Sequence, residues 1–76
     1  MPKLGPIDGK DLIKIFLKFG YRITGGKGDH TTMQKRGSPR PVVIQHKKDL
    51  PDFIIKGNLN TAGMTREQYF KLRSEL

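Results

Sequence analysis

Residues 21–46, YRITGGKGDHTTMQKRGSPRPVVIQH, contain three short segments with the residue pattern of β-strands. Apolar and polar residues alternate in residues 21–24, which is the period of two that a half-buried strand shows. Residues 30–35 alternate in the same way, and residues 42–46 are rich in β-branched side chains. A glycine-rich loop separates the first two segments, and the Gly and Pro of residues 36–39 suit a turn. We therefore expect three strands, the last two forming an antiparallel hairpin.

An amphipathic helix is predicted before the first strand, over residues 8–20. Asp8 is a suitable N-cap, because its carboxylate can accept a free backbone N–H group of the first helical turn. Gly20 is placed to end the helix in a left-handed conformation. The apolar stripe that we expect to face the core comprises Leu12, Ile13, Phe16 and Leu17, widened by Ile15 and Phe19. An exposed basic row recurs every four residues at Lys10, Lys14 and Lys18.

Two further helices are predicted after the third strand. Pro51 suits the first turn of the second helix, and Asp49 or Asp52 is expected to cap it. Gly63 is expected to end it. The third helix starts in residues 65–68, TREQ, which have the pattern of a capping box. The residues expected to be buried are Phe53, Ile54 and Leu59 in the second helix and Tyr69, Phe70 and Leu72 in the third.

The predicted order of elements is α-β-β-β-α with a short C-terminal third helix, which places the chain in the α+β class. Residues 1–76 are expected to form one domain with a thin core, since a chain of this length buries only roughly 60% of its unfolded surface. Helices on one face of a three-stranded antiparallel sheet leave the other face open. That free face is where we expect a ligand to lie.

The charge of the chain is strongly positive and unevenly distributed. The net charge is +8. Residues 1–26 carry +3, residues 27–48 carry +5 and residues 49–76 carry none of the excess. A positive field of this kind attracts polyanions and steers their encounter with the protein. The distribution favours nucleic acid as a partner, although a solvated charged surface has the same composition.

Several classes of function are disfavoured by what the sequence lacks. There are no cysteines, so neither a disulfide framework nor a cysteine metal site is expected. No apolar run approaches the roughly 20 residues of a membrane span, which predicts a soluble, cytoplasmic protein without a membrane partner. No P-loop or H-E-x-x-H pattern is present. Asp29 and His30 are adjacent, so on a strand they are expected to point to opposite faces and not to share a metal. We expect no metal and no cofactor.

His30 is the candidate for chemistry, because histidine titrates near neutral pH and suits proton transfer. A histidine can act as acid or base when an RNA 2′-hydroxyl attacks its neighbouring phosphate. Such a reaction needs no metal where cations stabilise the phosphate charge. The glycines at positions 25, 26 and 28 can expose backbone N–H groups to phosphate oxygens. His46 ends the third strand, and its distance from His30 depends on the register. The residues expected to contact RNA are Lys27, Gly28, Lys35, Arg36, His46, Lys47 and Lys48.

The segments GYRITGGKGDHTTM, VVIQHKKDLP and LNTAGMTREQYFKL together resemble the HicA family of bacterial mRNA-cleaving toxins. The resemblance covers about residues 8–72. It rests on a helix that ends in Gly and an aromatic residue, and on Gly28-Asp29-His30, which matches a Gly-Ser/Asp-His motif. A later histidine before a Lys-acid-Leu-Pro run, His46 to Pro51, and the segment from Ala62 to Glu67 complete it. The order and spacing of these pieces are more specific than any one of them.

The resemblance implies a double-stranded-RNA-binding-like fold and a metal-independent endoribonuclease whose catalytic histidine is His30. It also implies a bacterial or archaeal cytoplasmic toxin, a monomer when free, that a HicB-type antitoxin binds and blocks. The chain departs from the family where Ile44 and Gln45, and no proline, precede His46, and where Asp29 replaces the commoner serine. In the second helix, glycine has moved inward to Gly57 and Asn58 takes an apolar place.

Two other functions are compatible with the same residues. A non-catalytic RNA-binding module of the same fold needs the basic face but no poised histidine, since double-stranded RNA is bound mainly by shape and backbone contacts. A protein-interaction subunit needs the basic surface only for an acidic partner. Cleavage that depends on His30 separates the ribonuclease from both.

Overall fold

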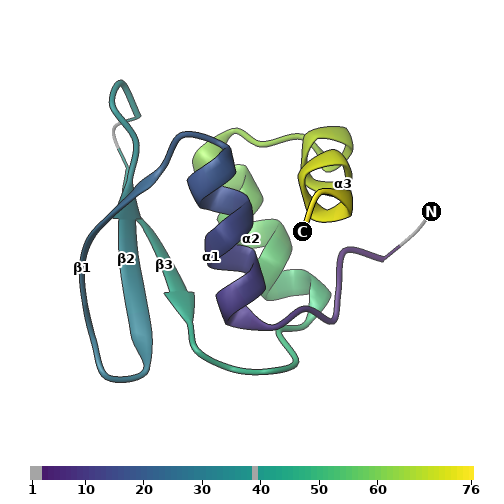
Figure 1. Ribbon diagram of the computed structural model, residues 1–76, viewed down its shortest axis with the longest axis horizontal. Helices are drawn as coiled ribbons and strands as arrows, with labels where there is room; N and C mark the ends of the chain where they lie inside the picture. The colour runs from purple at the N-terminus through teal and green to yellow at the C-terminus, as the bar shows by residue number, and fades with distance from the viewer. Residues whose placement is uncertain (1–2, 39) are drawn as a thin grey trace.

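The computed structural model describes residues 3–38 and 40–76 and has the α+β architecture that was predicted (Figure 1). The turn predicted over residues 36–39 includes Pro39, which lies outside the described residues. In chain order the elements are α1 (Gly9–Lys18), β1 (Arg22–Lys27), β2 (His30–Gln34), β3 (Val42–Gln45), α2 (Asp52–Ala62) and α3 (Arg66–Ser74).

The three strands form one antiparallel sheet in the order β1-β2-β3. Figure 1 shows α1 and α2 on the same side of this sheet, with α3 farther from it. The alternation in β3 shows how the sheet meets the helices, because Val42 and Ile44 are buried while Val43 and Gln45 are exposed. Residues paired across antiparallel strands share a face, so Met33, which pairs with Val42 and is buried, also faces the helices. The other face of the sheet is open.

Strand β1 is longer and more exposed than its sequence indicates. It extends to Lys27, so Gly25 and Gly26 lie in a strand that was predicted to end at residue 24. All six residues of β1 are exposed, including Ile23. The cause is its position at the edge of the sheet, beyond the cover of the helices.

Helix α1 begins and ends as predicted. Asp8 is the N-cap and accepts a hydrogen bond from the backbone N–H of Lys10, at 2.9 Å. Gly20 follows the C-cap and has a φ of 99°, a backbone conformation that is strained for any residue with a side chain. Leu12, Ile15 and Phe16 are fully buried. Leu17 was expected in the same stripe but is 46% exposed, because the buried face of the helix is narrower than predicted.

Helix α2 differs from its prediction at the N-terminus. The N-cap is Pro51 and makes no side-chain capping bond, so neither Asp49 nor Asp52 caps the helix. The Asp52 carboxylate instead accepts the backbone N–H of Gly5, at 2.7 Å. Phe53 was expected to be buried but is 73% exposed, and Ile55 occupies the core position. Gly63 ends the helix in the left-handed conformation, as predicted.

Helix α3 and the N-terminal segment close the side of the helices away from the sheet. The predicted capping box is present, with Thr65 and Gln68 exchanging hydrogen bonds of 3.1 and 2.9 Å. Tyr69 is fully buried, and its hydroxyl donates to the backbone oxygen of Leu4, at 2.7 Å. Leu4 itself lies in the core, which the sequence patterns did not predict. Ile54, Phe70 and Leu72, which were expected to be buried, are partly buried and pack against this core.

Candidate functional site

His30 is the first residue of β2 and lies on the open face of the sheet. The residues Gly28 and Asp29 form the turn from β1 into β2. In the register of the sheet, His30 is paired with Lys27 on β1 and with Gln45 on β3. Paired residues point to the same side, so a cation, an imidazole and an amide stand in one row across the three strands. The neighbouring pair Thr31 and Ile44 faces the helices instead.

The glycines before His30 have two different roles. Gly26 has φ of 137°, and a Cβ atom there would lie 2.5 Å from the carbonyl oxygen of His30. The fold therefore requires glycine at this position. Gly25 and Gly28 have no left-handed φ, and a Cβ atom at either would meet nothing within 4 Å. Their missing side chains leave the backbone of β1 and of the turn uncovered at these two positions, where a bound molecule can approach it.

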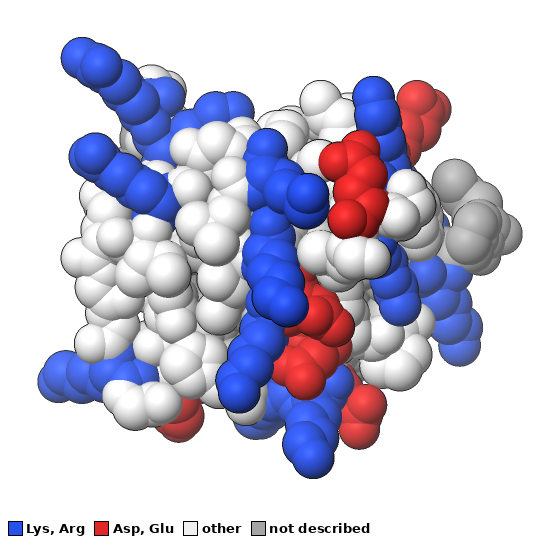
Figure 2. Space-filling view, in the orientation of Figure 1, with Lys and Arg blue, Asp and Glu red and all other residues white. Residues whose placement is uncertain are grey.

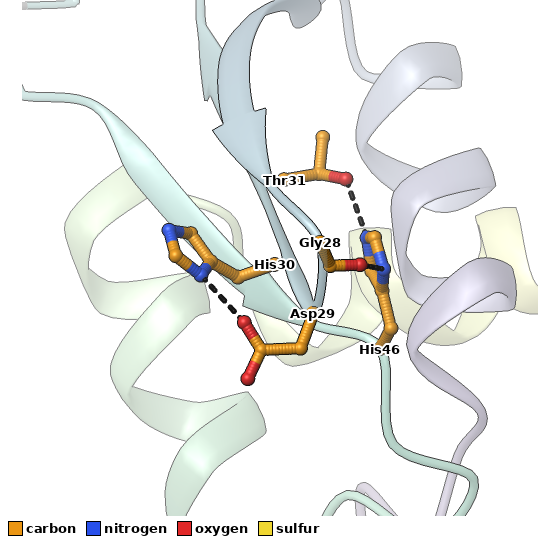
Figure 3. A network of polar contacts seen from close by, with 5 residues as sticks. All are labelled: Gly28, Asp29, His30, Thr31 and His46. Carbon is orange, nitrogen blue, oxygen red and sulfur yellow. Dashed lines mark hydrogen bonds and ion pairs between the residues drawn. The ribbon is translucent and has the colours of Figure 1, made fainter.

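Asp29 and His30 are joined by a hydrogen bond, contrary to the expectation that they point apart. The distance from Nδ1 of His30 to Oδ1 of Asp29 is 3.1 Å (Figure 3). Strand alternation does not apply because Asp29 belongs to the turn. A carboxylate only accepts hydrogen bonds, so Nδ1 of His30 carries the proton. The bond from His30 lowers the pKa of the Asp29 carboxyl below 3.8, and the backbone N–H of Asp29 lowers that pKa further.

The contact with Asp29 determines which nitrogen of His30 is available for chemistry. With its proton on Nδ1, the neutral ring has an unprotonated Nε2 that can act as a base. The side chain of His30 is 37% exposed, so the ring is accessible to a ligand on the open face. A carboxylate that holds the far side of an imidazole also stabilises the imidazolium that forms when Nε2 takes a proton.

His46 lies at the same end of the sheet, and its ring points away from that of His30 (Figure 3). Nε2 of His46 is 2.6 Å from Oγ1 of Thr31, and Nδ1 is 3.2 Å from the carbonyl oxygen of Gly28. Since Thr31 faces the helices, the two histidines lie on opposite sides of the hairpin. The register has brought them to one end of the sheet but has not brought the two rings together. We call Gly28, Asp29, His30, Thr31 and His46 the turn network.

The basic residues expected around His30 fall into two groups. Lys27 stands beside His30 in the register, and the exposed Lys47 and Lys48 directly follow His46. Lys35 and Arg36 lie beyond the other end of β2, roughly 17 Å away for five residues at the usual strand rise. Nζ of Lys35 is 4.2 Å from the centre of the Phe19 ring. Lys35 and Arg36 therefore do not supply charge at His30 itself, and their contact with RNA stays a prediction.

Cationic side chains also extend over the helices. Figure 2 shows Lys and Arg in a line over α1 and at both ends of the strands. Helix α1 itself carries the exposed Lys10, Lys14 and Lys18. Acidic side chains lie close to two of these lysines. Nζ of Lys14 is 4.0 Å from Oδ1 of Asp11, and Nζ of Lys18 is 3.9 Å from Oε1 of Glu75. The net positive charge is largest in residues 27–48, at +5, a segment that contains β2 and β3.

Neither a metal cluster nor a membrane span is found in the described part of the chain. Residues 3–38 and 40–76 bring together no group of three potential His, Cys, Asp or Glu ligands. Within the same residues, no helix is both long and apolar enough to cross a bilayer.

Gln45 is a site residue that the sequence patterns missed. The sequence marked it only as one of two residues that precede His46 where the family has a proline nearby, yet the register places it directly beside His30 on the open face. Its amide can donate hydrogen bonds to an anionic ligand. The signal that could have found it is the count of residues from the hairpin turn, which requires the register between β2 and β3.

The fold and the site define a class of protein: a small α-β-β-β-α-α protein with a double-stranded-RNA-binding-like fold and a partly exposed histidine beside a hairpin turn. Comparison with known proteins makes this class specific. The family model described as "HicA toxin of bacterial toxin-antitoxin" matches residues 9–64. The chain belongs to this HicA toxin family.

A solved structure supports the same assignment. The structure titled "Toxin-Antitoxin complex from Streptococcus pneumoniae" contains a chain that is 35% identical to this one, with a TM-score of 0.68. The match covers 78% of this chain and 100% of that chain. The comparison with curated proteins found no match.

Proposed function

We propose that the protein is the toxin of a type II toxin–antitoxin system and cleaves mRNA in the cytoplasm as a metal-independent endoribonuclease. The observation that carries the proposal is the arrangement of His30. Its Nδ1 is held by Asp29, its Nε2 has no hydrogen-bond partner among residues 3–38 and 40–76, and Lys27 stands beside it on the open face. Membership of a family of toxins supports the same function.

The reaction that this arrangement supports is attack of an RNA 2′-hydroxyl on the adjacent phosphate. Nε2 of His30 accepts the proton of the 2′-hydroxyl as the new bond from the 2′-oxygen to phosphorus forms. The bond from phosphorus to the 5′-oxygen breaks, and that oxygen takes a proton from water. The imidazolium of His30 then returns its proton to the hydroxide left by that water. The products are a 2′,3′-cyclic phosphate and a 5′-hydroxyl. Asp29 stabilises the imidazolium, while Lys27 and the amide of Gln45 stabilise the charge that develops on the phosphate.

The proposal is tested by inducible expression of the wild type and of His30→Ala in a bacterial host. We expect the wild type to arrest growth and to deplete total mRNA, and His30→Ala to do neither, because the other members of the row are a cation, Lys27, and an amide, Gln45, neither of which accepts a proton. Lys71→Ala, which removes an exposed charge from α3, is the matched control and should be as toxic as the wild type. Arrest by both the wild type and His30→Ala, or by neither, would remove the support for a His30-dependent ribonuclease.

We further propose that the free toxin is a monomer and that its protein partner is a HicB-type antitoxin, which covers the face carrying His30. The neighbouring structure is of a toxin–antitoxin complex, which supports a partner of this kind. Co-expression with such an antitoxin should abolish growth arrest, and the purified pair should elute together in size-exclusion chromatography. If the pair forms while RNA cleavage continues, the antitoxin does not cover the site.

A further inference from the structure

His46 is bound to the turn before His30 by three contacts. Its backbone N–H donates to the carbonyl oxygen of Asp29, at 2.8 Å. Its ring contacts the carbonyl oxygen of Gly28 through Nδ1 and the hydroxyl of Thr31 through Nε2. All three partners belong to the turn or to the start of β2, and the ring lies on the side of the hairpin away from His30 (Figure 3). The ring is thus directed at the turn and not at the open face.

These partners determine the protonation of the His46 ring. A carbonyl oxygen accepts hydrogen bonds and cannot donate them, so Nδ1 of His46 must carry a proton to bond Gly28. In the neutral ring Nε2 is then an acceptor for the hydroxyl proton of Thr31. Both ring nitrogens are satisfied by protein groups, which leaves neither for a phosphate or a reacting hydroxyl.

One planar peptide connects His46 to the carboxylate that holds His30. The carbonyl of Gly28 and the N–H of Asp29 belong to the same trans peptide, so they point in opposite directions. The carbonyl is bound by His46. The N–H of Asp29 belongs to the same residue as the carboxylate and lowers the pKa of that group. The same carboxylate accepts Nδ1–H of His30. Rotation of this peptide would therefore displace the carboxylate from the His30 ring.

We propose that His46 is a positioning residue for His30, acting through the Gly28–Asp29 peptide and the Asp29 carboxylate, and that it does not contact RNA. The inference deepens the proposed function, because the role of His46 rests on His30 being the base. It replaces the RNA contact that the sequence predicted for His46. Gly9 fits this arrangement, since its backbone N–H donates to the carbonyl oxygen of Lys47, at 2.8 Å, and fixes the chain that follows His46.

The protonation of the two rings is measured by long-range ¹H–¹⁵N NMR of the imidazole nitrogens. In the wild type, we expect both histidines in the Nδ1–H form. In His46→Ala, the ring of His30 should become a mixture of both forms, because Asp29 no longer holds it. In His46→Asn, the side-chain amide can replace Nδ1–H as the donor to the carbonyl oxygen of Gly28. The ring of His30 should then be in the Nδ1–H form, as in the wild type. An unchanged His30 signal in His46→Ala, or equal loss in His46→Ala and His46→Asn, would overturn the proposal.

The kinetic test uses a short RNA with one cleavage site. For His46→Ala we expect kcat to fall roughly tenfold to a hundredfold, as for a slightly misplaced catalytic group, with KM near that of the wild type. His46→Asn should recover most of kcat. A raised KM with unchanged kcat would show that His46 binds RNA and would overturn the proposal. If the wild type does not cleave RNA, the proposed function fails, whereas the NMR measurement still decides the role of His46.

Discussion

At the scale of single residues, the pair of Asp29 and His30 shows where sequence reasoning ends. The strand pattern predicted His30 at the start of a strand, and His30 is the half-buried first residue of β2. The same pattern predicted that Asp29 points to the opposite face, which is wrong. A turn residue is not bound by strand alternation, so its side chain direction depends on the backbone of Gly28 and Asp29. Periodicity alone therefore cannot predict a contact between adjacent residues across the end of a strand.

The Asp29 carboxyl provides a prediction at this scale. Because its pKa is lowered in the folded protein, the carboxylate bonds His30 fully at neutral pH, and the bond is lost as the pH falls through this lowered pKa. In His30→Ala, the largest cause of the shift is removed, so the pKa of Asp29 should rise toward 3.8. Titration followed by ¹³C NMR of the carboxyl measures this change. The same pKa in both proteins would mean that the two side chains do not interact in solution.

At the scale of elements, local signals predicted more than signals that depend on packing. The N-cap of α1, the left-handed Gly63 and the capping box of α3 involve residues within a few positions of each other, and each was confirmed. The prediction that Phe53 is buried was wrong. The contact of α2 with β3, and not the pattern of apolar residues within α2, determines which side of the helix faces the core. The predicted end of β1 at residue 24 was wrong, because pairing with β2 overrides the low strand preference of Gly25 and Gly26.

Helix α2 carries a glycine that its structure does not require. A Cβ atom at Gly57 would meet nothing within 4 Å, and the residue is exposed in the middle of the helix. Gly57→Ala should therefore raise the free energy of unfolding by up to about 1 kcal/mol. Gly26→Ala is the opposite case. Because Gly26 has a positive φ and lies close to the His30 carbonyl oxygen, this substitution should lower the free energy of unfolding. Thermal unfolding followed by circular dichroism measures both variants. A lower unfolding temperature for Gly57→Ala than for the wild type would contradict this prediction.

At the scale of the whole molecule, the chain ends are joined by a buried contact far from the site. The hydroxyl of Tyr69 and Nη1 of Arg73 each lie 2.7 Å from the carbonyl oxygen of Leu4, so α3 holds the N-terminal segment against the helices. Burial raises the pKa of the Tyr69 hydroxyl, so it stays a donor through neutral pH. Composition and charge could predict one small basic domain, but not this closure, which joins residues 65 positions apart.

Tyr69→Phe tests the closure without changing the volume of the core. Loss of one buried hydrogen bond should lower the free energy of unfolding by about 1 kcal/mol. The turn network lies elsewhere, so RNA cleavage at a temperature where the variant is folded should equal that of the wild type. Urea unfolding and a cleavage assay on the same sample measure both. A large loss of cleavage in a folded Tyr69→Phe variant would mean that the end of the chain communicates with His30.

The central claim is that the imidazole of His30 moves a proton during attack by an RNA 2′-hydroxyl. The most direct measurement compares the wild type and His30→Ala on one defined RNA in the presence of EDTA, with mass spectrometry of the fragment ends. We expect the wild type to yield a 2′,3′-cyclic phosphate and a 5′-hydroxyl, an RNA with a 2′-deoxy sugar at the cleavage site to stay intact, and His30→Ala to yield no product. Equal cleavage by the two proteins, or cleavage of the 2′-deoxy substrate, would contradict the claim.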